Sequence, residues 1–95
     1  MAKRKSSEIF QALAMMHFNG WQHLSRNQII LNLFAKYGLA VCQTTVGNLL
    51  RRQYVSDLLE MADGSALITI SDSENERKNF TYKVSSDKCE ILFNQ

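Results

Sequence analysis

A chain of 95 residues has room for a single compact domain. Hydrophobic residues make up 45% of it, enough to bury one core, but no apolar run approaches the roughly 20 residues that span a bilayer. Because no secretory apolar block follows the basic start of the chain, we expect a cytoplasmic protein with no membrane association.

The charged residues are unevenly distributed along the chain. Residues 1–56 hold seven basic residues and one acidic residue, whereas residues 57–95 hold four basic and eight acidic residues. A basic half joined to an acidic half indicates that the first half faces a polyanion, with a chance asymmetry of solvated faces as the alternative. Lys3, Arg4 and Lys5 are expected to lie in a flexible basic tail formed by residues 1–6.

A first helix is predicted for residues 7–18. Its apolar side chains recur at spacings of four and three residues, from Ile9 through Leu13 to Met16, which places them on one helix face. A serine precedes this segment as a cap, and Asn19-Gly20 is a natural stop.

A second helix is predicted for residues 26–37. Ser25 and Gln28 have the spacing of a capping box, in which each side chain satisfies an exposed backbone amide near the other. An apolar stripe runs from Ile29 to Tyr37, and Gly38 supplies the left-handed residue that ends many helices.

A third helix is predicted after a short link, with Val46, Leu49 and Leu50 on its inner side. The sequence does not fix the first residue of this helix to within one turn, because Cys42 is a poor capping residue and Thr44 is a better one. The outer side of this helix is expected to present Gln43, Thr44, Thr45, Gly47, Asn48, Arg51 and Arg52.

The rest of the chain has a β pattern. Residues 54–62 fit either a helix or a strand, and the helical spacing of their apolar residues slightly favours a helix. Residues 66–71 and 80–84 predict two strands joined by the polar loop 72–79, and residues 90–93 predict a last short strand. The predicted fold is α+β, with three N-terminal helices followed by a β-hairpin and a short last strand in one domain, 1–95.

This element order is that of a winged helix-turn-helix, in which the third helix enters the DNA major groove and the hairpin loop reaches the flanking backbone. Amide and hydroxyl side chains can meet base edges, and arginines can hold phosphates. The expected DNA contacts are Arg26, Gln43, Thr44, Thr45, Asn48, Arg51 and Arg52 from the helices, with Arg77 and Lys78 from the hairpin loop. The alternatives are a capping cluster and solvated charges, and Glu74 and Glu76 beside the loop cations would repel phosphate.

The segment from Leu24 to Leu50 resembles the helix-turn-helix of winged-helix bacterial regulators. Its end, Val-Cys-Gln-Thr-Thr-Val-Gly-Asn-Leu-Leu, is similar to the recognition segment of arginine-repressor N-terminal domains. Trp21 with the run Ser-Arg-Asn-Gln-Ile is similar to small regulators of the CaiF/GrlA kind. Arginine repressors have a Ser-Arg pair where this chain has Gly47 and Asn48, and glycine weakens a helix by about 0.5–1 kcal/mol relative to alanine.

The resemblance implies a sequence-specific regulator of transcription that binds double-stranded DNA, from a bacterium, a plasmid or a phage. A single winged helix offers a small contact surface, so we expect a homodimer whose contact involves the first helix and residues 91–93. The alternative function is a winged-helix adaptor or host-factor inhibitor that binds a protein partner through the acidic C-terminal half and makes no direct DNA contact.

No catalytic or metal-binding pattern is evident in the sequence. His17 and His23 are six residues apart and have no cysteine or acidic residue at metal-ligand spacing, and Cys42 has no histidine partner at a recognisable offset. We therefore expect no enzyme activity, no cofactor and no metal, and we expect Cys42 and Cys89 to be reduced thiols.

Overall fold

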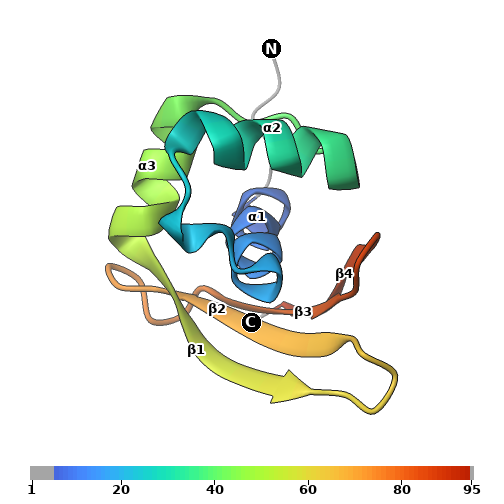
Figure 1. The fold of residues 1–95 in the computed structure, drawn as a ribbon. Helices are drawn as coiled ribbons and strands as arrows, with labels where there is room; N and C mark the ends of the chain where they lie inside the picture. The colour runs from blue at the N-terminus through green and yellow to red at the C-terminus, as the bar shows by residue number, and fades with distance from the viewer. Residues whose placement is uncertain (1–5, 95) are drawn as a thin grey trace.

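The computed structural model describes residues 6–94, and their side chains up to residue 92, as three helices followed by a four-stranded antiparallel sheet (Figure 1). The helices are α1 (Ser6–Asn19), α2 (Arg26–Tyr37) and α3 (Gln43–Arg52), with the short 3-10 turn η1 (Trp21–His23) between α1 and α2. The strands are β1 (Gln53–Glu60), β2 (Ala66–Asp72), β3 (Asn79–Val84) and β4 (Cys89–Asn94), and they lie in the sheet in chain order. The α+β class is therefore confirmed.

The predicted start of the ordered chain needs one correction. Ser6, assigned from the sequence to the tail, begins α1. Lys3, Arg4 and Lys5 lie outside the described residues.

The helix favoured for residues 54–62 is wrong, because residues 54–60 belong to β1 and pair with β2, and residues 61 and 62 enter the turn that follows. A β-bulge between Val55 and Asp57 inserts one extra residue into β1. As a result, Val55 and Leu58 pair with Ile70 and Ile68 on the same face of the sheet although they are three residues apart. The bulge therefore produced the spacing that resembled a helix.

The hairpin predicted from residues 66–71 and 80–84 is confirmed as β2–β3, but a further strand, β1, precedes it and pairs with β2. The hairpin that follows α3 is β1–β2, and its turn lies at residues 61–65, whereas the polar loop at residues 73–78 joins β2 to β3. This loop returns to the C-terminal end of α3, where the Ser73 amide donates a hydrogen bond to the Arg52 carbonyl (2.8 Å). The sequence predicted one hairpin and a last strand, whereas the four strands form a continuous antiparallel meander.

The core is built around α1, which lies between the sheet and the α2–α3 pair (Figure 1). Because α1 is covered on more than one side, all five residues from Ala12 to Met16 are buried. The sheet contributes its inner face, where Ile68 and Ile70 of β2 alternate with half-buried residues. Since its apolar side chains are used in the core, α1 offers little of the apolar surface expected for a dimer contact.

Within residues 6–94, none of the helices has the length and apolar character needed to traverse a membrane.

Candidate nucleic-acid interface

The relative position of α2 and α3 is set by caps and by the core. The Ser25 hydroxyl accepts a hydrogen bond from the Gln28 amide (3.3 Å) at the start of α2, which is one of the two bonds of the predicted capping box. Gly38 ends α2 in the left-handed conformation (φ 70°), which a residue with a side chain rarely adopts. Val46 of α3 is fully buried, so the opposite side of α3 is turned to the surface.

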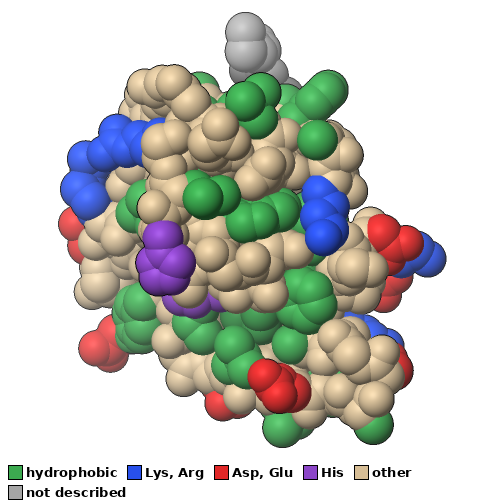
Figure 2. Space-filling model, viewed as in Figure 1, with side chains coloured by type: hydrophobic (Ala, Val, Ile, Leu, Met, Phe, Trp, Pro, Cys, Tyr) green, Lys and Arg blue, Asp and Glu red, His purple; other side chains and the backbone are tan. Residues whose placement is uncertain are grey.

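The outward side of α3 collects six of the expected contact residues. Gln43, Thr44, Arg51 and Arg52 are exposed, whereas Thr45 and Asn48 are half-buried. The helix sequence, Gln-Thr-Thr-Val-Gly-Asn-Leu-Leu-Arg-Arg, contains no acidic residue. Figure 2 shows the acidic side chains mostly over the sheet side of the molecule and none over α2.

The start of α2 lies against α3 through two consecutive residues. The Asn27 side-chain oxygen accepts a hydrogen bond from Nε2 of Gln43 (2.5 Å). Arg26 extends its guanidinium over Gly47, where a Cβ atom would lie 3.1 Å from Cζ and Nη1 of Arg26. Gly47, expected on the outer side of the helix, is therefore buried. Asn27 is not among the contact residues predicted from the sequence, and its local signal is its place beside Arg26 at the start of a helix.

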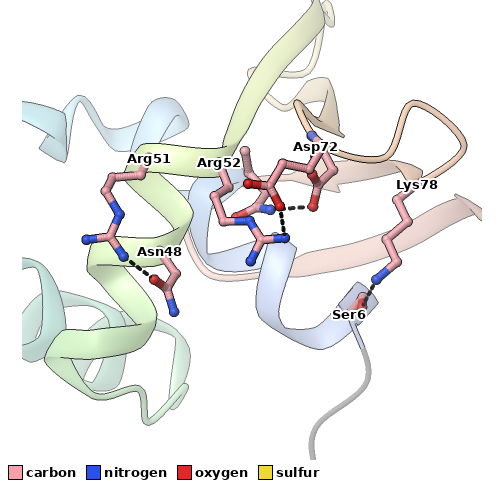
Figure 3. A network of polar contacts seen from close by, with 8 residues as sticks. Ser6, Asn48, Arg51, Arg52, Asp72 and Lys78 are labelled. Atoms are coloured by element: carbon pink, nitrogen blue, oxygen red, sulfur yellow. Dashed lines mark hydrogen bonds and ion pairs between the residues drawn. The ribbon is translucent and has the colours of Figure 1, made fainter.

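The two arginines at the end of α3 differ in their partners (Figure 3). Arg51 donates through Nη2 to the side-chain oxygen of Asn48, one turn earlier on the same helix. Arg52 forms an ion pair with Glu74 (2.5 Å), and both side chains are about half exposed or more, at 48% and 63%. An exposed ion pair contributes little to stability, about 0–1 kcal/mol, but the carboxylate reduces the positive charge that Arg52 offers to a phosphate. Arg51 is consequently the better-placed cation of the two.

A buried carboxylate connects α3 to the β2–β3 loop (Figure 3). Asp72 is 4% exposed and accepts hydrogen bonds from Nε2 of Gln53 (2.6 Å) and from the Glu74 amide (2.7 Å). Burial alone would raise the pKa of Asp72, but these hydrogen bonds and the nearby Arg52 charge lower that pKa below its ordinary value. Asp72 therefore remains ionised and anchors the loop beside the C-terminal end of α3.

The two loop cations lie in the β2–β3 loop, where the sequence placed them. Lys78 donates through Nζ to the Ser6 hydroxyl (3.4 Å) and lines a groove of about 210 Å³ together with Thr45, Asn48 and Arg52. Arg77 is exposed and does not line this groove. The structure thus brings Lys78 next to the α3 residues and leaves Arg77 outside that group.

The turn of the β1–β2 hairpin carries acidic side chains in place of basic ones. Glu60 and Asp63 are exposed there, and Asp63 lies 3.8 Å from Lys83. The Asp63 carboxylate also accepts hydrogen bonds from Ser65, which lower its pKa. This turn is electrostatically unsuited to contact phosphate.

The two cysteines have opposite surroundings. Cys42 is exposed at the N-cap of α3, and a hydrogen bond with the Thr45 hydroxyl (3.3 Å) lowers the pKa of its thiol. Burial raises the pKa of Cys89 to about 12. Among the residues that the structure describes, no group of three or more His, Cys, Asp or Glu side chains is arranged to hold a metal ion.

No family model matches the sequence, and neither a curated protein nor a solved structure is detectably similar to it.

Proposed function

We propose that the chain is a winged-helix regulator of transcription that binds double-stranded DNA through α3. The observation that supports this proposal best is the outward side of α3, which carries uncharged polar and basic side chains and no acid. The opposite side of the helix is anchored in the core by Val46 and Leu49. A rigid helix with such a surface suits the major groove of B-DNA, which is about 12 Å wide.

The proposal gives each group of side chains a role. Gln43, Thr44, Thr45 and Asn48 face base edges, since amides and hydroxyls can both donate and accept hydrogen bonds. Arg51 and Lys78 neutralise phosphates on the two sides of the groove. The β2–β3 loop, which Asp72 ties to α3, takes the flanking role, because Lys78 lies beside α3 there and Glu74 is paired with Arg52.

A homodimer is part of the proposal, with β4 as the contact strand. β4 is an edge strand, and its residues Ile91 and Leu92 are 46% and 43% exposed. Both edge strands have a register shift, at residue 56 in β1 and at Leu92 in β4. β1 is less suited to pairing because the Asp57 carboxylate accepts a hydrogen bond from the Leu58 amide (3.0 Å). The exposed apolar side chains of β4 favour its pairing with β4 of a second copy in a closed dimer. Phe93, also expected at this contact, has a side chain outside the described part of the chain.

The first experiment is fluorescence-anisotropy binding to random duplex DNA at about 50 and 200 mM salt. We expect the wild-type protein to bind and to lose affinity steeply at the higher salt concentration. Arg51→Glu is expected to weaken binding by about tenfold or more, because it places a carboxylate against phosphates. Lys88→Glu is the matched control, since it reverses one charge in the β3–β4 turn, at the end of the sheet away from α3. A folded wild-type protein that fails to bind DNA at low salt would refute the proposal.

The second candidate function is that of a protein-binding adaptor without DNA contact. It is favoured by the exposed apolar side chains of the β1–β2 hairpin, where Leu58, Leu59 and Met61 are 46%, 56% and 39% exposed beside Glu60. The same titration separates the two functions, because an adaptor of this kind gives no anisotropy change with DNA at low salt.

A further inference from the structure

Gly47 lies in the middle of α3, where glycine is a poor choice for helix stability. Its backbone does not require glycine, because the glycines with positive φ in the described chain are Gly20, Gly38 and Gly64. The space around it does favour glycine. A Cβ atom at position 47 would lie 3.1 Å from Cζ and Nη1 of Arg26 and 3.3 Å from Nη2. The missing side chain therefore makes room for a guanidinium that comes from α2.

Arg26 is one of two consecutive α2 residues that reach α3 at this place. Asn27, its neighbour, accepts the hydrogen bond from Gln43 (2.5 Å), and Gln43 precedes Gly47 by one helical turn. These two contacts bring the start of α2 to the side of α3 on which Gln43 and Gly47 lie. Arg26 is an exposed residue although its guanidinium lies against Gly47.

Positions 43, 47 and 51 are four residues apart and form a single row along α3. Gln43 supplies an amide at the first position, and Arg51 supplies a guanidinium at the third, held by Asn48. At the second position, Gly47 supplies no side chain, and the Arg26 guanidinium lies there. The row thus presents hydrogen-bond donors on three successive turns, although the middle one belongs to another helix.

We propose that Arg26 replaces the missing side chain at position 47 and reads a guanine edge in the DNA that α3 binds. This inference depends on the proposed function, and it names a specificity-determining residue for it. A guanidinium is a planar fork of donors that matches the paired acceptors N7 and O6 of guanine, whereas an ammonium is a point charge. Packing against the α3 backbone holds the fork in place before binding, which reduces the conformational entropy lost on contact.

The test begins with selection of bound duplexes from a randomised library by the wild-type protein. The selected duplex is then titrated with the variants Gly47→Ala, Arg26→Ala, the double variant and Arg26→Lys. Lys88→Ala is the matched control, because it removes one positive charge from the opposite end of the sheet. Thermal melting is measured for every variant, so that folding and binding are separated.

We expect Gly47→Ala to melt no lower than the wild type, since the flexible Arg26 end can swing aside and alanine is the better helix former. The same variant is expected to bind the selected duplex about tenfold more weakly, because one bidentate contact with a base is lost. In the Arg26→Ala background, Gly47→Ala should have almost no further effect on affinity. Arg26→Lys should keep binding to random DNA but lose the preference for guanine at one position of the site.

The inference is wrong if Gly47→Ala binds the selected duplex as the wild type does. It is also wrong if Arg26→Lys keeps the guanine preference and weakens binding to all sequences alike, which would make Arg26 a phosphate contact. Either result leaves the proposed function intact, because the wild type still binds DNA. If the wild type binds no duplex at low salt, the proposed function fails first and this inference fails with it.

Discussion

Cys42 and Cys89 show how strongly the surroundings of one residue change its chemistry. The Cys42 thiol is exposed, and its pKa is lowered by the hydrogen bond with Thr45. The Cys89 thiol packs against the core, and burial raises its pKa to about 12. Since the thiolate is the reactive form, the two residues differ both in access and in the fraction of reactive species.

We expect iodoacetamide at about pH 8 to alkylate Cys42 rapidly and Cys89 only after unfolding. Mass spectrometry of quenched samples measures both rates in one experiment. Cys42 lies at the N-cap position of α3, the helix proposed to enter the groove. Saturating duplex DNA should therefore slow the alkylation of Cys42 and leave the alkylation rate of Cys89 unchanged. Equal rates for the two thiols in the native protein would contradict the described burial, and a Cys42 rate indifferent to bound DNA would contradict the docking of α3.

At the scale of elements, the connection between α3 and the β2–β3 loop depends on one buried carboxylate. Asp72 accepts hydrogen bonds from Gln53, the first residue of β1, and from Glu74 in the loop. Beside it, the Arg52 carbonyl accepts a hydrogen bond from the Ser73 amide (2.8 Å). The loop that carries Lys78 is therefore positioned by the end of the proposed recognition helix, and a change at Asp72 should affect both elements.

We expect Asp72→Asn to lower the free energy of unfolding at neutral pH by about 1–3 kcal/mol, because Gln53 and the Glu74 amide donate to different oxygens of Asp72 and asparagine replaces one of these oxygens with an NH2 donor. The folded-state pKa of Asp72 is lowered, so its contribution is fully present above the unfolded pKa of about 3.9 and is lost as the pH falls through the folded value. The stability difference between the variant and the wild type should therefore narrow below about pH 4. Urea unfolding of both proteins at several pH values between neutral and acidic measures this stability difference.

Asp87→Asn, in the exposed β3–β4 turn, is the control for the loss of one negative charge. A difference between Asp72→Asn and the wild type that does not change with pH would show that the carboxylate charge has no part in holding the loop.

At the scale of the whole molecule, the two sides have different characters. The α2–α3 side carries the cations proposed to meet DNA, and β4 lies at the far edge of the sheet (Figure 1). The longest dimension of the molecule is 35 Å. Two copies joined through β4 would therefore hold their α3 helices far apart. One turn of DNA is about 34–36 Å long, and we expect the centres of the two half-sites to be farther apart than this.

Sedimentation velocity tests the dimer. We expect Leu92→Glu to convert a dimer to a folded monomer, because it places a charge at an exposed apolar position of β4. Leu59→Glu is the matched control, since it makes the same change at an exposed leucine of the other edge strand and should leave the dimer intact. A monomeric wild type, or dissociation caused by Leu59→Glu and not by Leu92→Glu, would rule out the β4 contact.

The helices could be predicted from the sequence because their signals are local. Ser25 caps a backbone amide three residues away, and Gly38 ends α2 with its own backbone conformation. The outward side of α3 could be predicted from the positions of Val46 and Leu49, which mark the buried side of the same helix. These interactions join residues at most four positions apart, so the order of the chain already contains them.

The tertiary structure alone decided the features that depend on residues far apart in the chain. Residues 54–60 are a strand because they pair with β2 across a hairpin, and the bulge between Val55 and Asp57 conceals the strand period. Gly47 is buried because Arg26 arrives from another helix, and Arg52 is neutralised by Glu74 from a loop 22 positions later. Spacing along one segment carries no information about such partners, since packing brings them together only when the whole chain folds.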